Sequence, residues 1–228
     1  MIGLHRRALT LGVGLVSAAL LWIGPADAQA ARVVESTYLK LPYSTEAGAG
    51  ERRQVTTLTP TGLKARFLVM KERRIEGSIW FGIRLPTRPN RGLGWVRAER
   101  VEVLRSPARL VLSLRSRRLA LFLNGKRVWR TRVVIGKART PTPRGVFGLW
   151  DRRRVTGDTK PWIFETTAHS RRLRTFDNGP ARIAFHGRHG ELDAPWGSAS
   201  SNGCIRTPDW ALRSIRKRAP LGTPIEVR

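Results

Sequence analysis

The chain has 228 residues, with 43 Lys or Arg against 16 Asp or Glu, so its formal net charge is +27. A 41% share of hydrophobic residues is too high for a disordered tail, and the length allows one large domain or two small ones. The single Cys excludes a disulfide framework within the chain and a cysteine-based zinc cluster, because both need several cysteines. The charge leaves three partner classes open, namely nucleic acid, anionic lipid and an anionic wall polymer.

The first 30 residues are typical of an export signal peptide. His5-Arg6-Arg7 form a short basic region, and an apolar run follows at 8–23. Ala26-Asp27-Ala28 places small residues at the two positions that a signal peptidase reads. An uncleaved membrane anchor is the alternative, since the run approaches the length of a membrane span. In either case we expect the rest of the chain outside the cytoplasm, in the periplasm or the cell wall.

The basic residues comprise 36 Arg and 7 Lys, and export argues against nucleic acid as their partner. No helix-turn-helix pattern or RNA-binding aromatic signature accompanies them. We expect most of them to be solvated surface, with attraction to anionic polymers of the envelope as their function.

Residues 31–105 are predicted to form a small β domain. Apolar runs at 66–70, 78–84 and 94–97 are separated by turn residues, of which Pro86 to Gly92 are the clearest. The stretch from Trp80 to Val96 resembles the end of bacterial SH3-like domains, which are small β-barrels of exported wall proteins. We expect Trp80 and Trp95 to be core residues of such a barrel, since aromatic side chains dominate small cores.

Ser106-Pro107 marks the expected start of a second domain, residues 106–228. Strands are predicted at 110–114, 119–123 and 127–133, and Asn124-Gly125 predicts a tight hairpin because both positions tolerate positive φ. Further strands are predicted at 145–150, 162–166, 182–186 and 223–227.

One helix is expected after residue 206. Thr207 is a suitable N-cap, Pro208 suits the first helical position and Pro220 ends the helix. The only cysteine, Cys204, would then lie three residues before a helix.

Cys204 and His186 are the candidate nucleophile and base. A helix start and Arg206 nearby favour the thiolate, and Gly203 lets backbone amides approach a substrate as an oxyanion site. His186 ends the apolar strand Ile183-Ala184-Phe185, where a buried strand meets a loop. The remaining histidines fit less well: His5 lies in the signal, and His169 and His189 lie in loops.

The ordered pair Ile183-Ala184-Phe185-His186-Gly187 and Ser201-Asn202-Gly203-Cys204-Ile205-Arg206 resembles the signature of the L,D-transpeptidase (YkuD-type) catalytic domain. That signature is a His, a loop, Ser or Thr, commonly a second His, Gly, Cys, a hydrophobe and often Arg. Thr140 to Phe147 and Leu221 to Val227 resemble further parts of the family. Asn202 departs from it, because many members have His there.

The resemblance implies a mainly β protein with a YkuD-type β-sandwich catalytic domain and few helices, following the SH3-like domain. It implies an acyltransferase of peptidoglycan biosynthesis and cell-wall biogenesis that affects cell shape. Cys204 would attack a tetrapeptide stem, release D-alanine and form 3→3 cross-links, with no metal or organic cofactor. His186 would be the base, Gly187 would hold its ring, Gly203 would help to bind the oxyanion, and the loop residues Ser201, Asn202 and Arg206 would contact substrate.

Two alternatives remain beside that activity. Water as acceptor would make the protein an L,D-carboxypeptidase on the same stems. A degenerate catalytic domain would leave a non-catalytic wall-binding protein. Sortases and NlpC/P60 peptidases also use Cys and His, but the spacing or order of those residues differs from His186 before Cys204.

Overall fold

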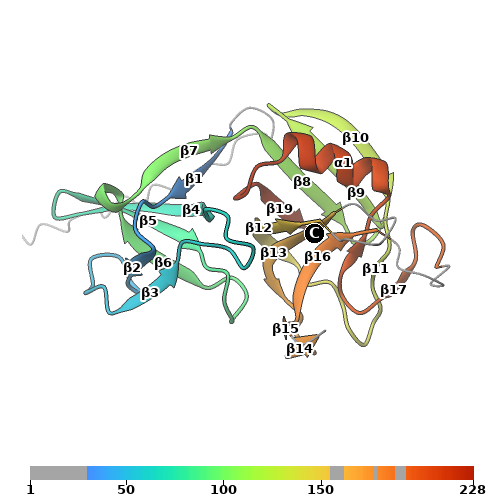
Figure 1. Cartoon of the computed structure of the whole chain (residues 1–228), viewed down its shortest axis with the longest axis horizontal. Helices are drawn as coiled ribbons and strands as arrows, with labels where there is room; N and C mark the ends of the chain where they lie inside the picture. The colour runs from blue at the N-terminus through green and yellow to red at the C-terminus, as the bar shows by residue number, and fades with distance from the viewer. Residues whose placement is uncertain (1–29, 155–161, 177–178, 188–193) are drawn as a thin grey trace, which may run out of the picture.

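The computed structural model describes residues 30–154, 162–176, 179–187 and 194–228. The expected export signal lies outside these ranges except for Ala30. Within the described ranges, no helix has the length and apolar character needed to cross a membrane. The strands divide between two lobes, which we call the N-terminal lobe (residues 30–106) and the C-terminal lobe (residues 107–228) (Figure 1).

The N-terminal lobe is built on a five-stranded sheet. Its order is β6-β5-β4-β1-β7, and the strands are β1 (Ala31–Glu35), β4 (Arg66–Ile75), β5 (Ser78–Arg84), β6 (Leu93–Arg97) and β7 (Glu102–Ser106). A hairpin of β2 (Lys40–Tyr43) and β3 (Arg53–Thr56) and the 3-10 turn η1 (Ala98–Arg100) complete it. Trp80 and Trp95 are buried, at 2% and 6% exposure, as expected of core residues. The SH3-like character of this lobe stays a prediction.

The C-terminal lobe contains a mixed eight-stranded sheet of order β10-β9-β8-β19-β12-β13-β16-β18. Its strands are β8 (Ala108–Ser113), β9 (Arg118–Leu123), β10 (Lys126–Arg132), β12 (Gly145–Arg153), β13 (Ile163–His169), β16 (Arg182–His186), β18 (Ile205–Arg206) and β19 (Pro224–Val227). Two small pairs flank it: β11 (Ile135–Gly136) with β17 (Ala199–Ser201), and β14 (Thr175–Phe176) with β15 (Gly179–Pro180). The prediction of a mainly β fold is confirmed.

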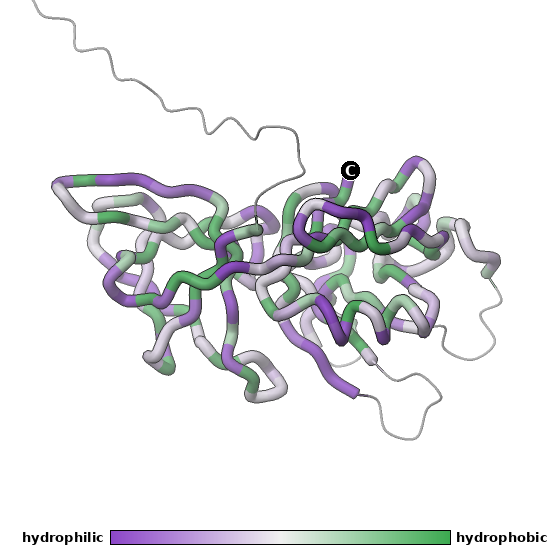
Figure 2. The backbone as a smooth tube through the Cα atoms, turned by 90° about the horizontal axis from the view of Figure 1, so that it is seen from above, coloured by the Kyte–Doolittle hydropathy of each residue, from purple (hydrophilic) through white to green (hydrophobic). Residues whose placement is uncertain are grey.

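Local sequence explains several of these strands. Asn124 and Gly125 have φ values of 47° and 77°, the positive values that a tight hairpin needs, and they join β9 to β10 as predicted. Hydrophobic and hydrophilic stretches alternate along the backbone of both lobes (Figure 2), because each sheet has a core side and a solvent side.

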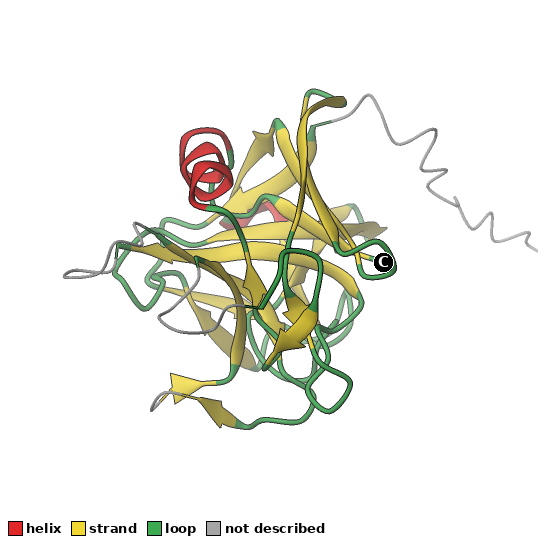
Figure 3. Cartoon of the chain, turned by 90° about the vertical axis from the view of Figure 1, so that its right-hand side faces the viewer, coloured by secondary structure: helices red, strands yellow, loops and turns green. Residues whose placement is uncertain are grey.

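The single described α-helix, α1 (Asp209–Arg218), covers the C-terminal sheet at one side (Figure 3). Ala211, Leu212 and Ile215 are its buried residues and join the core of the C-terminal lobe. The predicted cap is wrong: Pro208 occupies the N-cap position, and the Thr207 hydroxyl donates to the carbonyl of Ile205 instead. The helix therefore begins five residues after Cys204 rather than three.

The two lobes pack closely through buried side chains. Trp150 lies on β12 of the C-terminal lobe, yet it belongs to the core of the N-terminal lobe, where its ring is 5.7 Å from that of Phe67. Gly222, at φ 81°, approaches β1 so closely that a Cβ there would lie 2.8 Å from a methyl group of Val33. The contact between the lobes thus includes core packing as well as surface polar groups.

Candidate active site

Strand β16 separates a core face from a cleft face by simple alternation. Ile183 and Phe185 are 3% and 0% exposed and belong to the core of the C-terminal lobe. Side chains of Arg182, Ala184 and His186 lie on the opposite face, because successive side chains of a strand alternate. These three residues line a cleft of about 820 Å³ that also contains Cys204. The sequence Arg-Ile-Ala-Phe-His therefore places the predicted base in the cavity that holds the predicted nucleophile.

Cys204 lies directly before β18, which pairs in parallel with β16. Its Sγ is 3.7 Å from the carbonyl oxygen of Arg182, the acceptor of a hydrogen bond from the thiol. The backbone N–H of Ala184 also contacts the sulfur. The thiol therefore lies half-buried in the cleft, against the backbone of β16.

Burial raises the pKa of the Cys204 thiol above its ordinary value. The Ala184 N–H and the positive charge of Arg206 oppose this effect, whereas the negative charge of Glu165 adds to it. The expectation that a nearby helix start would favour the thiolate is therefore wrong in direction, because burial outweighs the electropositive neighbours. Burial thus favours the protonated thiol over the thiolate.

The imidazole of His186 is held by its own loop. Its Nδ1 is 2.7 Å from the carbonyl oxygen of Gly187. A carbonyl can only accept a hydrogen bond, so Nδ1 carries a proton. This is the contact that the family resemblance implies for Gly187. A neutral imidazole in this tautomer can accept a proton from a thiol.

The loop before Cys204 is shaped by hydrogen bonds within the protein. Ser201 is 2% exposed; its hydroxyl donates to the carbonyl of Cys204 at 2.6 Å and accepts the N–H of Gly203 at 3.1 Å. Gly203 has φ 120°, a value that side-chain-bearing residues rarely adopt. Its N–H is thus used inside the loop, which does not favour the predicted role of Gly203 as an oxyanion donor.

Thr140 and Thr142 support the same loop, and sequence reasoning did not assign them this role. Thr142 donates from Oγ1 to the carbonyl of Gly203 at 2.8 Å, and Thr140 Oγ1 lies 3.3 Å from the carbonyl of Ser201. Gly136 donates its N–H to Thr142 Oγ1, and a Cβ at Gly136 would lie 2.3 Å from the Thr140 carbonyl oxygen. The Thr-Pro-Thr-Pro stretch was the available signal, because a rigid segment with two hydroxyls suits a loop support.

The predicted substrate-contacting residues differ in exposure. Asn202 is exposed at the cleft, whereas Ser201 and Arg206 line it but are largely buried. Arg206 pairs its backbone N–H and carbonyl with Val134 at 2.9 and 3.0 Å. The structure thus gathers Cys204, His186 and all five of their predicted partners in one region.

Among the described residues, no group of three His, Cys, Asp or Glu could hold a metal ion.

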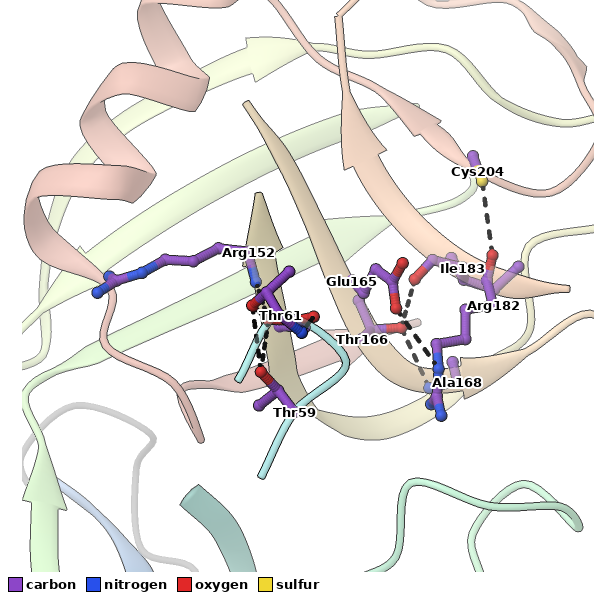
Figure 4. Close-up of polar contacts among 10 residues, drawn as sticks. Thr59, Thr61, Arg152, Glu165, Thr166, Ala168, Arg182, Ile183 and Cys204 are labelled. Carbon is purple, nitrogen blue, oxygen red and sulfur yellow. Dashed lines mark hydrogen bonds and ion pairs between the residues drawn. The ribbon is translucent and has the colours of Figure 1, made fainter. Parts of the chain in front are cut away.

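Two charged side chains of the cleft were not anticipated from the sequence. Glu165 on β13 and Arg182 on β16 form an ion pair of 3.5 Å between Arg182 Nε and Glu165 Oε2 (Figure 4).

His169, which was expected in a loop, ends β13 and is 3% exposed. Burial lowers the pKa of His169 to about 4, and the charges of Arg182 and Arg88 add to this effect.

The N-terminal lobe supports one side of the cleft and contributes Pro60 to its lining. Asn90 bonds the backbone of His169 twice, through its Nδ2 to the carbonyl (2.7 Å) and through its Oδ1 to the N–H (2.8 Å). Arg88 donates to the carbonyls of Ser170 and Leu173 at 2.6 and 2.7 Å, and both of those residues line the cleft. From another loop of this lobe, Pro60 reaches the cleft directly.

A thiol and an imidazole in one cleft, with the imidazole held by a carbonyl, are the groups that a thiol-dependent acyl-transfer site requires. The family model of the L,D-transpeptidase catalytic domain (YkuD) matches residues 107–227, more than half of the chain. The chain therefore belongs to the L,D-transpeptidase catalytic domain family, whose members act on peptidoglycan stem peptides.

Solved L,D-transpeptidases are similar to this chain at low identity. The one from Mycobacterium smegmatis is 11% identical, with a TM-score of 0.44 over 71% of this chain and 99% of its own. The one from Stackebrandtia nassauensis is 18% identical, with a TM-score of 0.41 over 55% and 57%. The catalytic domain of the E. faecium enzyme is 21% identical, with a TM-score of 0.38 over 53% and 96%. No curated relative matches the sequence.

Proposed function

We propose that the chain is a cysteine-dependent L,D-transpeptidase that forms 3→3 cross-links between peptidoglycan stems. The observation that carries this proposal is the shared cleft of Cys204 and His186, with His186 Nδ1 bound by the Gly187 carbonyl. Membership of the YkuD family supplies the substrate class. The shared cleft supports the assignment of Cys204 as the nucleophile and His186 as the base.

Acylation begins with transfer of the Cys204 proton to His186 Nε2. The sulfur attacks the carbonyl carbon of the third residue of a tetrapeptide stem, and a C–S bond forms. The oxyanion then collapses, the bond to the terminal D-alanine breaks, and His186 returns the proton to the leaving amine. The product is a thioester on Cys204 and free D-alanine.

The environment of the thiol explains why this step needs a base. A resident thiolate would attack unaided, but burial raises the pKa of Cys204 and so favours the protonated thiol. We assign the oxyanion contact to the N–H of Cys204 itself, because the Gly203 N–H is donated to Ser201. One such donor is worth on the order of 3 kcal/mol in other enzymes.

The acceptor decides between transpeptidase and carboxypeptidase. The side-chain amine of a second stem attacks the thioester, the C–S bond breaks, and the amine proton passes by way of His186 to the Cys204 sulfur; the new amide is the cross-link. Water as acceptor gives a free tripeptide stem instead, which is the alternative activity. The apolar residues of the cleft wall, among them Ile163, Leu173 and Phe176, favour the first outcome because they limit access of water to the thioester.

The rest of the chain is assigned by sequence. We propose that residues 1–30 export the protein to the periplasm or cell wall, or anchor it there, and that residues 31–105 form an SH3-like domain. We further propose that the net charge of +27 attracts anionic envelope polymers, an interaction that salt weakens.

Mass spectrometry of products from purified tetrapeptide stems tests the activity. We expect a cross-linked dimer and free D-alanine from the wild type, and neither from Cys204→Ala, which has no nucleophile. His186→Ala should bind the stem with near-normal affinity but acylate at least about a hundredfold more slowly, the range for loss of a general base. D-alanine release by Cys204→Ala would contradict the assignment. Stem binding without any release by the wild type would identify a wall-binding protein.

A further inference from the structure

We infer that Glu165 binds the side-chain ammonium of the diamino-acid residue of the stem, and that Arg182 positions the Glu165 carboxylate. This inference rests on the proposed function and adds a specificity-determining residue to it. It starts from the placement of the one acidic side chain among the described residues that line the cleft.

Strand register brings Glu165 close to the thiol. Glu165 on β13 lies opposite Ala184 on β16, and the N–H of Ala184 contacts the sulfur of Cys204. Directly opposed residues of an antiparallel pair project to the same face, so Glu165 faces the cleft together with Ala184 and Arg182. Adjacent strands are about 4.8 Å apart, so the carboxylate lies within one or two strand spacings of the reacting sulfur.

The distance suits a diamino acid bound for reaction. The attacked carbonyl belongs to the third residue of the stem, and the side chain of that residue leaves from the adjacent carbon atom. A flexible stem of about four carbons separates that carbon from the charged amine in lysine-like residues. The ammonium of the residue under attack can therefore reach the neighbouring strand without leaving the cleft.

The charges of the cleft direct an ammonium to this position. Arg153, Arg182 and Arg206 line the cleft and repel a cation, whereas carboxylates of the stem are attracted to them. Glu165 is the negatively charged side chain among these arginines of the cleft. Its side chain is 23% exposed, so the carboxylate is accessible from the cleft while much of it is shielded from water.

Arg182 leaves the carboxylate able to accept a further donor. The 3.5 Å contact between Arg182 Nε and Glu165 Oε2 is longer than a charge-assisted hydrogen bond, which measures about 2.8 Å. An ionised carboxylate has about four acceptor sites. Arg182 is 14% exposed and stacks over Trp150 at 5.8 Å, so it forms a fixed cationic support behind Glu165. Its charge opposes the effect of burial, which raises the pKa of Glu165.

Two stems that differ only in this amine test the inference. One is a tetrapeptide stem with a free side-chain amine on the third residue, and the other carries an acetyl group on that amine. Acylation is followed as D-alanine released in a single turnover with enzyme in excess, which needs no acceptor amine. We expect the wild type to prefer the free amine by about 10- to 100-fold, the range of one hydrogen bond to a charged group.

Glu165→Gln should remove most of that preference. It should slow acylation by the free-amine stem and leave the acetylated stem within about twofold of the wild type, whereas a merely structural role would slow both stems equally. Glu165→Asp should retain part of the preference. Glu226→Gln is the matched control, because Glu226 also pairs with an arginine, Arg109 at 3.4 Å, but does not line the cleft. Equal preference in Glu165→Gln and the wild type, or no preference in the wild type, would overturn the inference.

Calorimetry keeps this result separate from the proposed function. The Cys204→Ala protein cannot be acylated, so binding of the two stems reports recognition alone. We expect it to bind the free-amine stem more tightly, and we expect Cys204→Ala with Glu165→Gln to bind both stems alike. If the wild type releases no D-alanine from either stem, the proposed function fails while these affinities still decide the role of Glu165. Equal affinities of both stems for Cys204→Ala would overturn that role.

Discussion

Asp151 on β12 joins the two lobes through one buried carboxylate, and its removal should destabilise the protein measurably. Asp151 is 2% exposed. It accepts hydrogen bonds from the Thr59 hydroxyl (2.8 Å), the Thr61 hydroxyl (2.6 Å) and the Thr61 N–H (3.2 Å), and also from the N–H of Arg152 (2.8 Å) (Figure 4). Three of these four donors come from the N-terminal lobe. Asp151→Ala removes their acceptor at once.

The expected loss of stability is set by the hydrogen bonds that the donors lose and by those that they form with other partners instead. Each hydrogen bond to a charged group is worth about 1.5–3 kcal/mol. The net loss is smaller than the sum of these values, because removing Asp151 also removes the cost of burying its carboxylate. The Thr59 and Thr61 hydroxyls are 3.2 Å apart and can also bond each other. We therefore expect a loss of about 3 kcal/mol in the free energy of unfolding, which lowers Tm by about 6–12 °C in a chain of this size.

Thermal unfolding followed by near-ultraviolet circular dichroism measures this effect. Asp151→Asn keeps one acceptor oxygen and should recover part of the loss. Glu226→Ala removes a partly exposed ion pair and should change the unfolding free energy by less than about 1 kcal/mol. Because Pro60 lies between the two threonines and lines the cleft, Asp151→Ala should also raise KM. A Tm within about 2 °C of the wild type would refute the reasoning.

Three further predictions concern the cleft and its supports. Burial lowers the pKa of His169 to about 4, so the unfolded chain binds this proton more readily than the folded chain. The free energy of unfolding contributed by His169 should be full above about pH 6.5 and fall towards pH 4. In urea unfolding, His169→Gln should flatten that pH dependence. Burial raises the pKa of Cys204, so the rate of alkylation by iodoacetamide should reach half its maximum above pH 9; a midpoint below about pH 8 would show a resident thiolate. Asn90→Ala removes two hydrogen bonds to the backbone of His169, next to the cleft residue Ser170, and should lower kcat/KM at least about tenfold, whereas Arg52→Ala, on an exposed loop, should leave it unchanged.

Local patterns were sufficient to predict much of the secondary structure and the reacting pair. The strand predicted at 78–84 matches β5, and the Asn124-Gly125 hairpin has the predicted positive φ values. The signature around His186 and Cys204 identified the residues that the structure places in one cleft. These successes share a cause, because each depends on residues that are neighbours in the chain or on a motif of fixed spacing.

Contacts between distant parts of the chain could not be predicted in this way. Asn90 bonds His169 and Thr59 bonds Asp151 across 79 and 92 positions, and neither pair carries a local signal. Trp150 has the pattern of a strand residue of its own lobe but packs in the other core. The direction of the pKa shift of Cys204 was missed for a related reason, since burial depends on the whole fold rather than on the adjacent helix.

The contact between the Cys204 thiol and the Arg182 carbonyl also bears on chemical durability. Peroxides and disulfides react with thiolates, so a buried thiol that keeps its proton reacts slowly with both. For the function proposed above, in which Cys204 is the nucleophile and the protein is exported, such a resting state would slow the loss of activity to oxidants.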